Sequence, residues 1–242
     1  MKRISSLLTL TVFGLSLCLL PAAATAADQI KIATWEDIST FDPGWMTSAE
    51  RELIIMSSLY NGLVKYKEGS WDIVPDLAES WDTAPDGKSV VFHLRKNVQF
   101  HKGFGEMTAE DVKFSFDRIV DPKAEAAEKG TWKLLDSVEV VDKYTVKIIL
   151  KDKMANLFTS ALPMNSGFIV SKKAVEKMGR EKFSKDPIGT GPYQLDSWKP
   201  KTHVKLAAFD GYWGESPKIK NITFLPIVED STSETALRTG AV

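Results

Sequence analysis

The sequence predicts an α+β fold in which strands and helices follow one another without a regular alternation. Two hairpins indicate it: residues 74–103 carry an Asp86-Gly87 turn between a short amphipathic segment and an alternating strand, and residues 137–150 reverse at Asp142-Lys143. A third indication is "MTAEDVKFSF", in which Thr108 precedes two acids and an apolar stripe, as at the capped start of a helix.

The first half of the chain divides into short elements. Residues 29–35 alternate as a strand, "EDISTFDPGW" is a loop, and residues 48–60 have apolar positions at helical spacing. Residues 74–81 give a short amphipathic segment in which we expect Asp76 to face water. In the strand after Asp86-Gly87, Val90 and Phe92 point to one side, and the helix begun at Thr108 ends at Asp121-Pro122.

The second half continues in the same mixed style. Residues 154–164 read as a short helix, and residues 167–179 read as a strand and a helix that starts at Ser171 and closes at Gly179. A hairpin begins at Tyr193, "KNITFLPIV" is a strand, and residues 231–240 are a helix. The sequence contains no internal repeat or low-complexity tract.

The amino-terminal segment has the organisation of a cleaved export signal. Lys2 and Arg3 precede an apolar run from Leu7 to Leu20, and Ala24-Thr25-Ala26 forms an A-x-A site. We therefore expect a signal peptide over residues 1–26 and export to the periplasm. The single cysteine, Cys18, lies inside it, so the mature chain would have no disulfide or thiol.

Charge excludes some classes of partner. The chain has 31 basic and 32 acidic residues, and loss of Lys2 and Arg3 would leave a formal charge of −3. No basic patch or run of like charge suggests a nucleic acid or a membrane surface as the partner.

Several motifs occur in an order that resembles one family. "YNGLVKY" precedes "IVPDLAESWDTAPDGKSVVFHLRKNVQFHKG" and "TAEDVKFSFDRI"; "VDKYTVKIIL", "DPIGTGPYQLDSW", "FDGYWG" and "ALRTG" follow. Together they resemble the family 5 extracellular solute-binding proteins, the peptide and nickel receptors of ABC importers. The resemblance implies a periplasmic-binding-protein-like fold with an extra subdomain.

The resemblance also implies a division of the chain and a mechanism. Residues 27–47 and 161–242 would form the first lobe of a two-lobed receptor, and residues 48–160 an inserted subdomain. A peptide or similar solute would bridge the two lobes, and the membrane permease would recognise the closed, monomeric receptor. Because family members are longer, we expect the second lobe to be missing here, with the incomplete first lobe exposing apolar surface.

Two groups of residues are candidate ligand contacts. Trp35, Glu36 and Asp37 follow the first strand where family members border the cleft, and an aromatic ring with two acids suits a cationic or peptide amino group. The alternative places Trp35 in the core and both acids in water. Asn165 and Ser166 lie near the expected crossing between subdomain and lobe, where the alternative is a plain turn.

Other residues give no sign of catalysis, cofactor or metal. "GTGP", at residues 189–192, lacks the spacing of a phosphate loop, so its glycines indicate a tight backbone path. His93, His101 and His203 have no metal-ligand spacing. The tryptophans Trp71, Trp81, Trp198 and Trp213 lie in scaffold motifs and favour packing.

Three functions remain open. The first is a solute-binding protein for di- or oligopeptides, with nickel-chelate, opine or glycoside receptors of the same family as alternatives. The second is a stand-alone interaction protein derived from a first lobe. The third is an exported hydrolase, which the absence of G-x-S-x-G, cysteine nucleophile and zinc motif disfavours. The residues do not identify the ligand.

Overall fold

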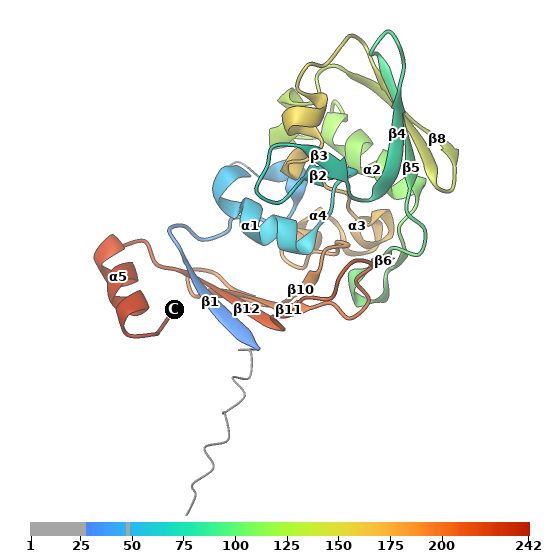
Figure 1. Ribbon diagram of the computed structural model, residues 1–242. Helices are drawn as coiled ribbons and strands as arrows, with labels where there is room; N and C mark the ends of the chain where they lie inside the picture. Colours follow the sequence, from blue (N-terminus) through green and yellow to red (C-terminus); the bar gives the residue numbers. More distant parts are fainter. Residues whose placement is uncertain (1–27, 47–48) are drawn as a thin grey trace, which may run out of the picture.

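The computed structural model describes residues 28–46 and 49–242, and it contains two four-stranded sheets joined by one continuous apolar core. Figure 1 shows one sheet low in the view, the other at upper right, and helices between and beside them. The predicted signal peptide falls outside the described residues. No helix of the described part combines the length and apolarity required to cross a membrane.

The first sheet has the order β1-β12-β11-β10 and joins the two ends of the described chain. β1 runs parallel to β12, while β11 pairs antiparallel with both β12 and β10. Its strands are β1 (Gln29–Thr34), β10 (Tyr193–Lys199), β11 (His203–Ala208) and β12 (Asn221–Pro226). All four predicted strands are confirmed.

The second sheet has the order β4-β5-β9-β8 and is antiparallel throughout. Both predicted hairpins are confirmed: Gly87 adopts a positive φ of 68° in one, and Asp142 accepts a hydrogen bond from the Tyr144 amide in the other. Its strands are β4 (Ala78–Thr83), β5 (Ser89–Leu94), β8 (Leu135–Asp142) and β9 (Thr145–Leu150). Two small ribbons accompany it: β2 (Val64–Tyr66) with β3 (Ile73–Pro75), and β6 (Gln99–Phe100) with β7 (Gly105–Glu106).

The helices are short, and two of them pack on the sheets. The α-helices are α1 (Ala49–Leu59), α2 (Ala109–Val120), α3 (Lys172–Met178), α4 (Arg180–Phe183) and α5 (Asp230–Arg238). The single-turn elements are η1 (Pro43–Trp45), η2 (His101–Gly103), η3 (Ala127–Gly130), η4 (Leu157–Ala161) and η5 (Asn165–Gly167). α2 packs on β8 and β9, and α1 packs on β10.

Local sequence signals explain where helices start and stop. Thr108 and Asp111 form a reciprocal capping box at the start of α2, and the Ser171 hydroxyl accepts from the Ala174 amide at the start of α3. The predicted strand before α3 is wrong: η5 occupies its beginning, and only an isolated bridge joins Phe168 to Gly62.

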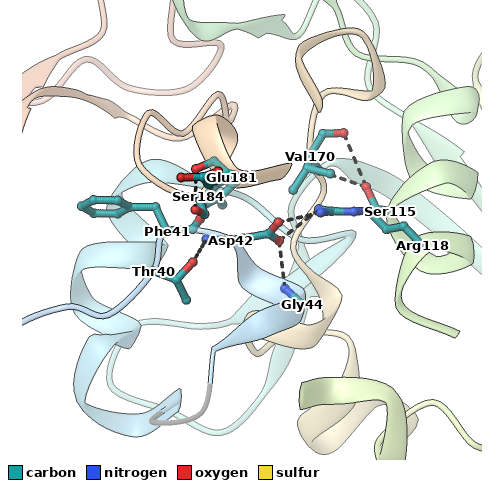
Figure 2. Close-up of polar contacts among 10 residues, drawn as sticks. Thr40, Phe41, Asp42, Gly44, Ser115, Arg118, Val170, Glu181 and Ser184 are labelled. Carbon is teal, nitrogen blue, oxygen red and sulfur yellow. Dashed lines mark hydrogen bonds and ion pairs between the residues drawn. The ribbon is translucent and has the colours of Figure 1, made fainter. Parts of the chain in front are cut away.

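A buried ion pair ties the loop after β1 to α2. The Arg118 guanidinium donates to both carboxylate oxygens of Asp42, at 3.0 and 2.6 Å, and the side chains are 10% and 0% exposed. Figure 2 shows that the Asp42 carboxylate also accepts a hydrogen bond from the Gly44 amide, and Asp42 thereby caps η1. Arg118 lies 4.5 Å from the centre of the Trp45 ring, so an aromatic face shields it from water.

Replacing Asp42 by Asn should destabilise the protein by about 3–5 kcal/mol, because Arg118 would keep its buried charge without a counter-ion. Urea denaturation followed by tryptophan fluorescence measures this change. The exposed pair between Lys113 and Asp117, at 2.8 Å, provides the control, since Asp117→Asn should cost less than about 1 kcal/mol. Equal losses in the two variants would contradict a structural role for the buried pair.

Candidate functional site

The carboxyl ends of β1 and β12 lie together at one edge of the first sheet. The two strands are parallel and in register to their last residues, Thr34 and Pro226. The Ile227 amide then donates to the Thr34 carbonyl at 2.7 Å, which keeps the departing chains together. Ligands of open α/β sheets commonly bind outside this end of the strands. We call residues 34–37 and 226–228 the carboxyl edge.

The predicted contacts Trp35, Glu36 and Asp37 all lie on the carboxyl edge. Trp35 is 74% exposed, so its alternative position in the core is wrong. Val228, on the partner segment, is 75% exposed. Two large apolar side chains are thus exposed to solvent at this end of the sheet.

Asp37 has one oxygen engaged and one without a partner. Its Oδ2 accepts a hydrogen bond of 2.6 Å from the Lys201 amide, in the turn between β10 and β11. Its Oδ1 is buried and has no hydrogen-bond partner among the described residues. An unpaired buried acceptor costs about 1–3 kcal/mol. A group from outside could donate to this oxygen only after the surrounding side chains moved.

Asn165 and Ser166 occupy the interior. Each is 2% exposed. The Asn165 amide donates to the Glu128 carboxylate at 3.0 Å and to the Pro43 carbonyl at 3.4 Å, and the Ser166 hydroxyl donates to the Ala161 carbonyl at 2.9 Å. These bonds tie η5 to η1 and η3. A contact of either residue with a ligand stays a prediction, without support from their position.

Several motifs meet in a buried polar network that sequence reasoning missed. The Asn61 amide donates to both oxygens of Asp76, at 3.1 and 3.3 Å. Its oxygen accepts from Thr190 at 3.1 Å and from the Trp213 indole at 3.4 Å. "YNGLVKY", "VPDLAESW", "GTGP" and "GYWG" therefore share one hydrogen-bonded centre.

The exposure expected for Asp76 is wrong. It is 2% exposed, and burial raises the pKa of its carboxyl group although Lys65 and Asn61 oppose the shift. The Arg95 Nε donates to the Asp76 carbonyl at 2.6 Å, and the guanidinium lies 4.8 Å from the centre of the Trp213 ring. The polar residues of "VPDLAESW" gave no indication that Asp76 is buried, because the rest of the network comes from other motifs of the chain.

The "GTGP" turn approaches the end of α1 too closely for a side chain. A Cβ on Gly189 would lie 2.1 Å from the Leu59 carbonyl oxygen, and one on Gly191 would lie 2.5 Å from the Leu59 carbonyl carbon. The Gly191 amide donates to that same carbonyl at 2.9 Å. The tight backbone path predicted for these glycines is confirmed.

Gly189→Ala should therefore destabilise the protein by about 1–3 kcal/mol or more, since backbone must move to admit the methyl group. Thermal unfolding followed by circular dichroism measures the loss. Gly130 offers a matched control, because a Cβ there would have no neighbour within 4 Å. Gly130→Ala should stay within about 0.5 kcal/mol of the parent; a harmless Gly189→Ala change would contradict the steric explanation.

His101 connects the η2 turn to "GTGP" as a neutral imidazole. Its Nε2 donates to the Gly191 carbonyl at 2.9 Å, and its Nδ1 accepts from the Gly189 amide at 3.3 Å. Burial lowers the pKa of His101 from 6.5 to about 4. Among the described residues no group of His, Cys, Asp and Glu side chains is arranged to hold a metal ion.

His101 should make stability fall as the pH falls from about 6.5 to about 4. In that window the unfolded chain takes up a proton at this histidine and the folded chain does not, so unfolding is favoured by up to about 3 kcal/mol at the acid end. Urea titrations across this range should show a smaller decline for His101→Gln than for the parent. Asp76 and Asp111, whose pKa values burial raises, titrate in both proteins and cancel in the difference. Parallel curves would contradict the assignment.

Comparison with known proteins gives one consistent result. The family model "Bacterial extracellular solute-binding proteins, family 5 Middle" matches residues 72–242. The Dipeptide-binding protein of Escherichia coli K12 is 35% identical over 87% of this chain and 43% of its own length. The glutathione-binding protein GsiB of the same strain is 31% identical over 96% of this chain and 44% of its own length.

Solved structures agree with these matches. MoaA from A. tumefaciens R10, in complex with mannopinic acid, superposes with a TM-score of 0.83 at 32% identity, over 90% of this chain and 44% of that one. DppA from Helicobacter pylori, a periplasmic binding protein with the peptide STSA, gives 0.81 at 31% identity, over 88% and 45%. NikZ from Campylobacter jejuni, with Ni(L-His), gives 0.80 at 27%, over 90% and 43%. The chain thus spans less than half the length of these proteins.

Proposed function

The chain belongs to the family 5 bacterial extracellular solute-binding proteins, and we propose on that premise that it is the substrate-binding component of an ABC importer. It would capture a peptide or a similar small solute in the periplasm and deliver it to the permease in the inner membrane. Its relatives are binding proteins, which supports a receptor and disfavours a hydrolase.

The observation that carries the proposal is the unused binding capacity of the carboxyl edge. Trp35 offers an exposed ring face, and Asp37 Oδ1 is an acceptor without a partner among the described residues that a small movement of its surroundings would open to a ligand. In our proposal the ring packs on the ligand and the carboxylate accepts from its amino or amide N–H. Glu36 adds negative charge beside them, which favours a cationic group over a second anion.

We also propose the lobe division predicted from the sequence. Residues 27–47 and 161–242 would be the first lobe, and every strand of the first sheet comes from them. Residues 48–160 would be the inserted subdomain, which contains the whole second sheet. The ligand would then lie between the carboxyl edge and a facing lobe, and the closed receptor, as a monomer, would be the form that the permease recognises.

Peptides are the first candidate ligands. Proteins named for a dipeptide and for glutathione, and a structure holding the peptide STSA, match this chain at 31–35% identity. Opines and a nickel–histidine complex are the alternatives, because MoaA and NikZ hold them in closely similar folds. Export by the predicted signal peptide, residues 1–26, belongs to the same proposal.

The test is a thermal-shift screen on the gene product purified from its own cells, with its mass determined first. Dipeptides, STSA, glutathione, Ni(L-His) and mannopinic acid are added in turn. One of them should stabilise the folded state, by about 2.7 kcal/mol at a hundredfold excess over Kd, and should be recovered intact. No stabilisation by any of them, or recovery of a cleaved product, would overturn the proposal.

Variants then place the ligand. Trp35→Ala should weaken the selected ligand about tenfold or more, as expected for a central aromatic contact, and Asp37→Asn should weaken ligands that carry an ammonium group. Trp71 is the matched control, because it is 85% exposed and lies on the β2–β3 connection. Equal effects of Trp71→Ala and Trp35→Ala would contradict binding at the carboxyl edge.

A further inference from the structure

A groove of about 1250 Å³ lies between α1, the β2–β3 ribbon and the segment that joins β11 to β12. That segment ends where Lys220 and Asn221 donate to the Asp28 carbonyl, beside the start of β1. The groove therefore lies toward the amino ends of β1 and β12, and the carboxyl edge lies at their other ends. None of the residues of the carboxyl edge lines it.

The floor of the groove holds a carboxylate whose charge is only loosely balanced. Asp76 is 2% exposed, and its nearest cation, the Lys65 ammonium, stands 3.6 Å from Oδ1, longer than an N–H···O hydrogen bond. The Lys65 side chain is itself 51% exposed. Arg95, the other nearby cation, binds the main chain of Asp76 and pairs with Glu79 at 3.7 Å. Lys65 is therefore the cation that pairs with this carboxylate, and its pairing is weak.

Aromatic side chains line the same groove as this carboxylate. Tyr66, Tyr193, Tyr212 and Trp213 all line the groove. The Trp213 indole is hydrogen-bonded through Asn61 to the Asp76 carboxylate, and its ring already carries the Arg95 guanidinium. A carboxylate at the base of aromatic walls is the arrangement that binds organic cations, because ring faces and the anion attract the same charge.

An anionic ligand fits the groove less well. The rim has lysines at Lys65, Lys67 and Lys218, but also Glu68 and Glu215. An anion in the groove would lie near the negative charge of Asp76, and like charges repel. A neutral ligand would leave the carboxylate as it is. The chemistry therefore favours a cation with an apolar body.

We propose that this groove is a second binding site, specific for a primary organic ammonium with an aromatic or aliphatic body, whose –NH₃⁺ replaces Lys65 at Asp76. The ammonium donates to the Asp76 carboxylate, and the body packs against Tyr66, Tyr212 and Trp213. The site does not depend on the ligand proposed for the carboxyl edge.

Calorimetric titration with three phenols of one shape tests the proposal: tyramine (cation), tyrosol (neutral) and 3-(4-hydroxyphenyl)propionate (anion). Tyramine should bind at least about tenfold more tightly than the other two, because only it makes a charged hydrogen bond to Asp76. Equal binding of tyramine and tyrosol, tighter binding of the propionate, or no heat from tyramine at millimolar concentration would overturn the proposal.

Two substitutions sharpen the result. Lys65→Met removes the competing cation and should tighten tyramine several-fold; weaker tyramine binding would overturn the exchange of ammonium groups. Asp76→Asn should weaken tyramine about tenfold or more, while Asp152→Asn, at a surface pair with Lys88, should not change it. If Asp76→Asn does not fold, the Lys65→Met result and the ratio of tyramine to tyrosol decide.

Discussion

The ion pair between Asp42 and Arg118 is the strongest single polar constraint on the arrangement of the two sheets. It joins the loop that leaves β1 to α2, and α2 packs on the second sheet. Its two parallel hydrogen bonds fix orientation as well as distance, and its burial makes separation of the partners costly. The carbonyl of Pro43, the next residue, accepts a hydrogen bond from Asn165, so the same loop also positions η5.

Local chemistry explains why much of this fold could be predicted. A capping box needs only residues three apart, as Thr108 and Asp111 are, and a hairpin turn needs only a residue such as Gly87 that tolerates positive φ. Such signals place the elements. They do not say which element packs on which, so the order β1-β12-β11-β10 came from the structure alone.

The polar residues of the interior could not be predicted for the opposite reason. The sequence around Asp76 and Asn165 gave no sign of their burial, because it depends on tertiary contacts: Asp76 accepts from Asn61, and Asn165 donates to Pro43 and Glu128. The position of Trp35 and Asp37 at the end of the first strand could be predicted, since the strand itself was evident from the sequence; their contact with a ligand stays a prediction. The sequence did not indicate that the Lys201 amide donates to one carboxylate oxygen of Asp37, while the other oxygen has no hydrogen-bond partner among the described residues.

These contacts also restrict how a clamshell mechanism can operate. The buried ion pair, the His101 bridge and the Asn61 centre attach residues 48–160 to the first sheet at separate points, so these parts must move as one body. α5 is different: none of its residues is buried, and the Lys31 ammonium holds the Ala241 carbonyl beyond it at 3.2 Å. Local motion is easiest where few groups are buried. If the proposed function requires a closing movement, these attachments favour a movement after β12 over one between residues 48–160 and the first sheet.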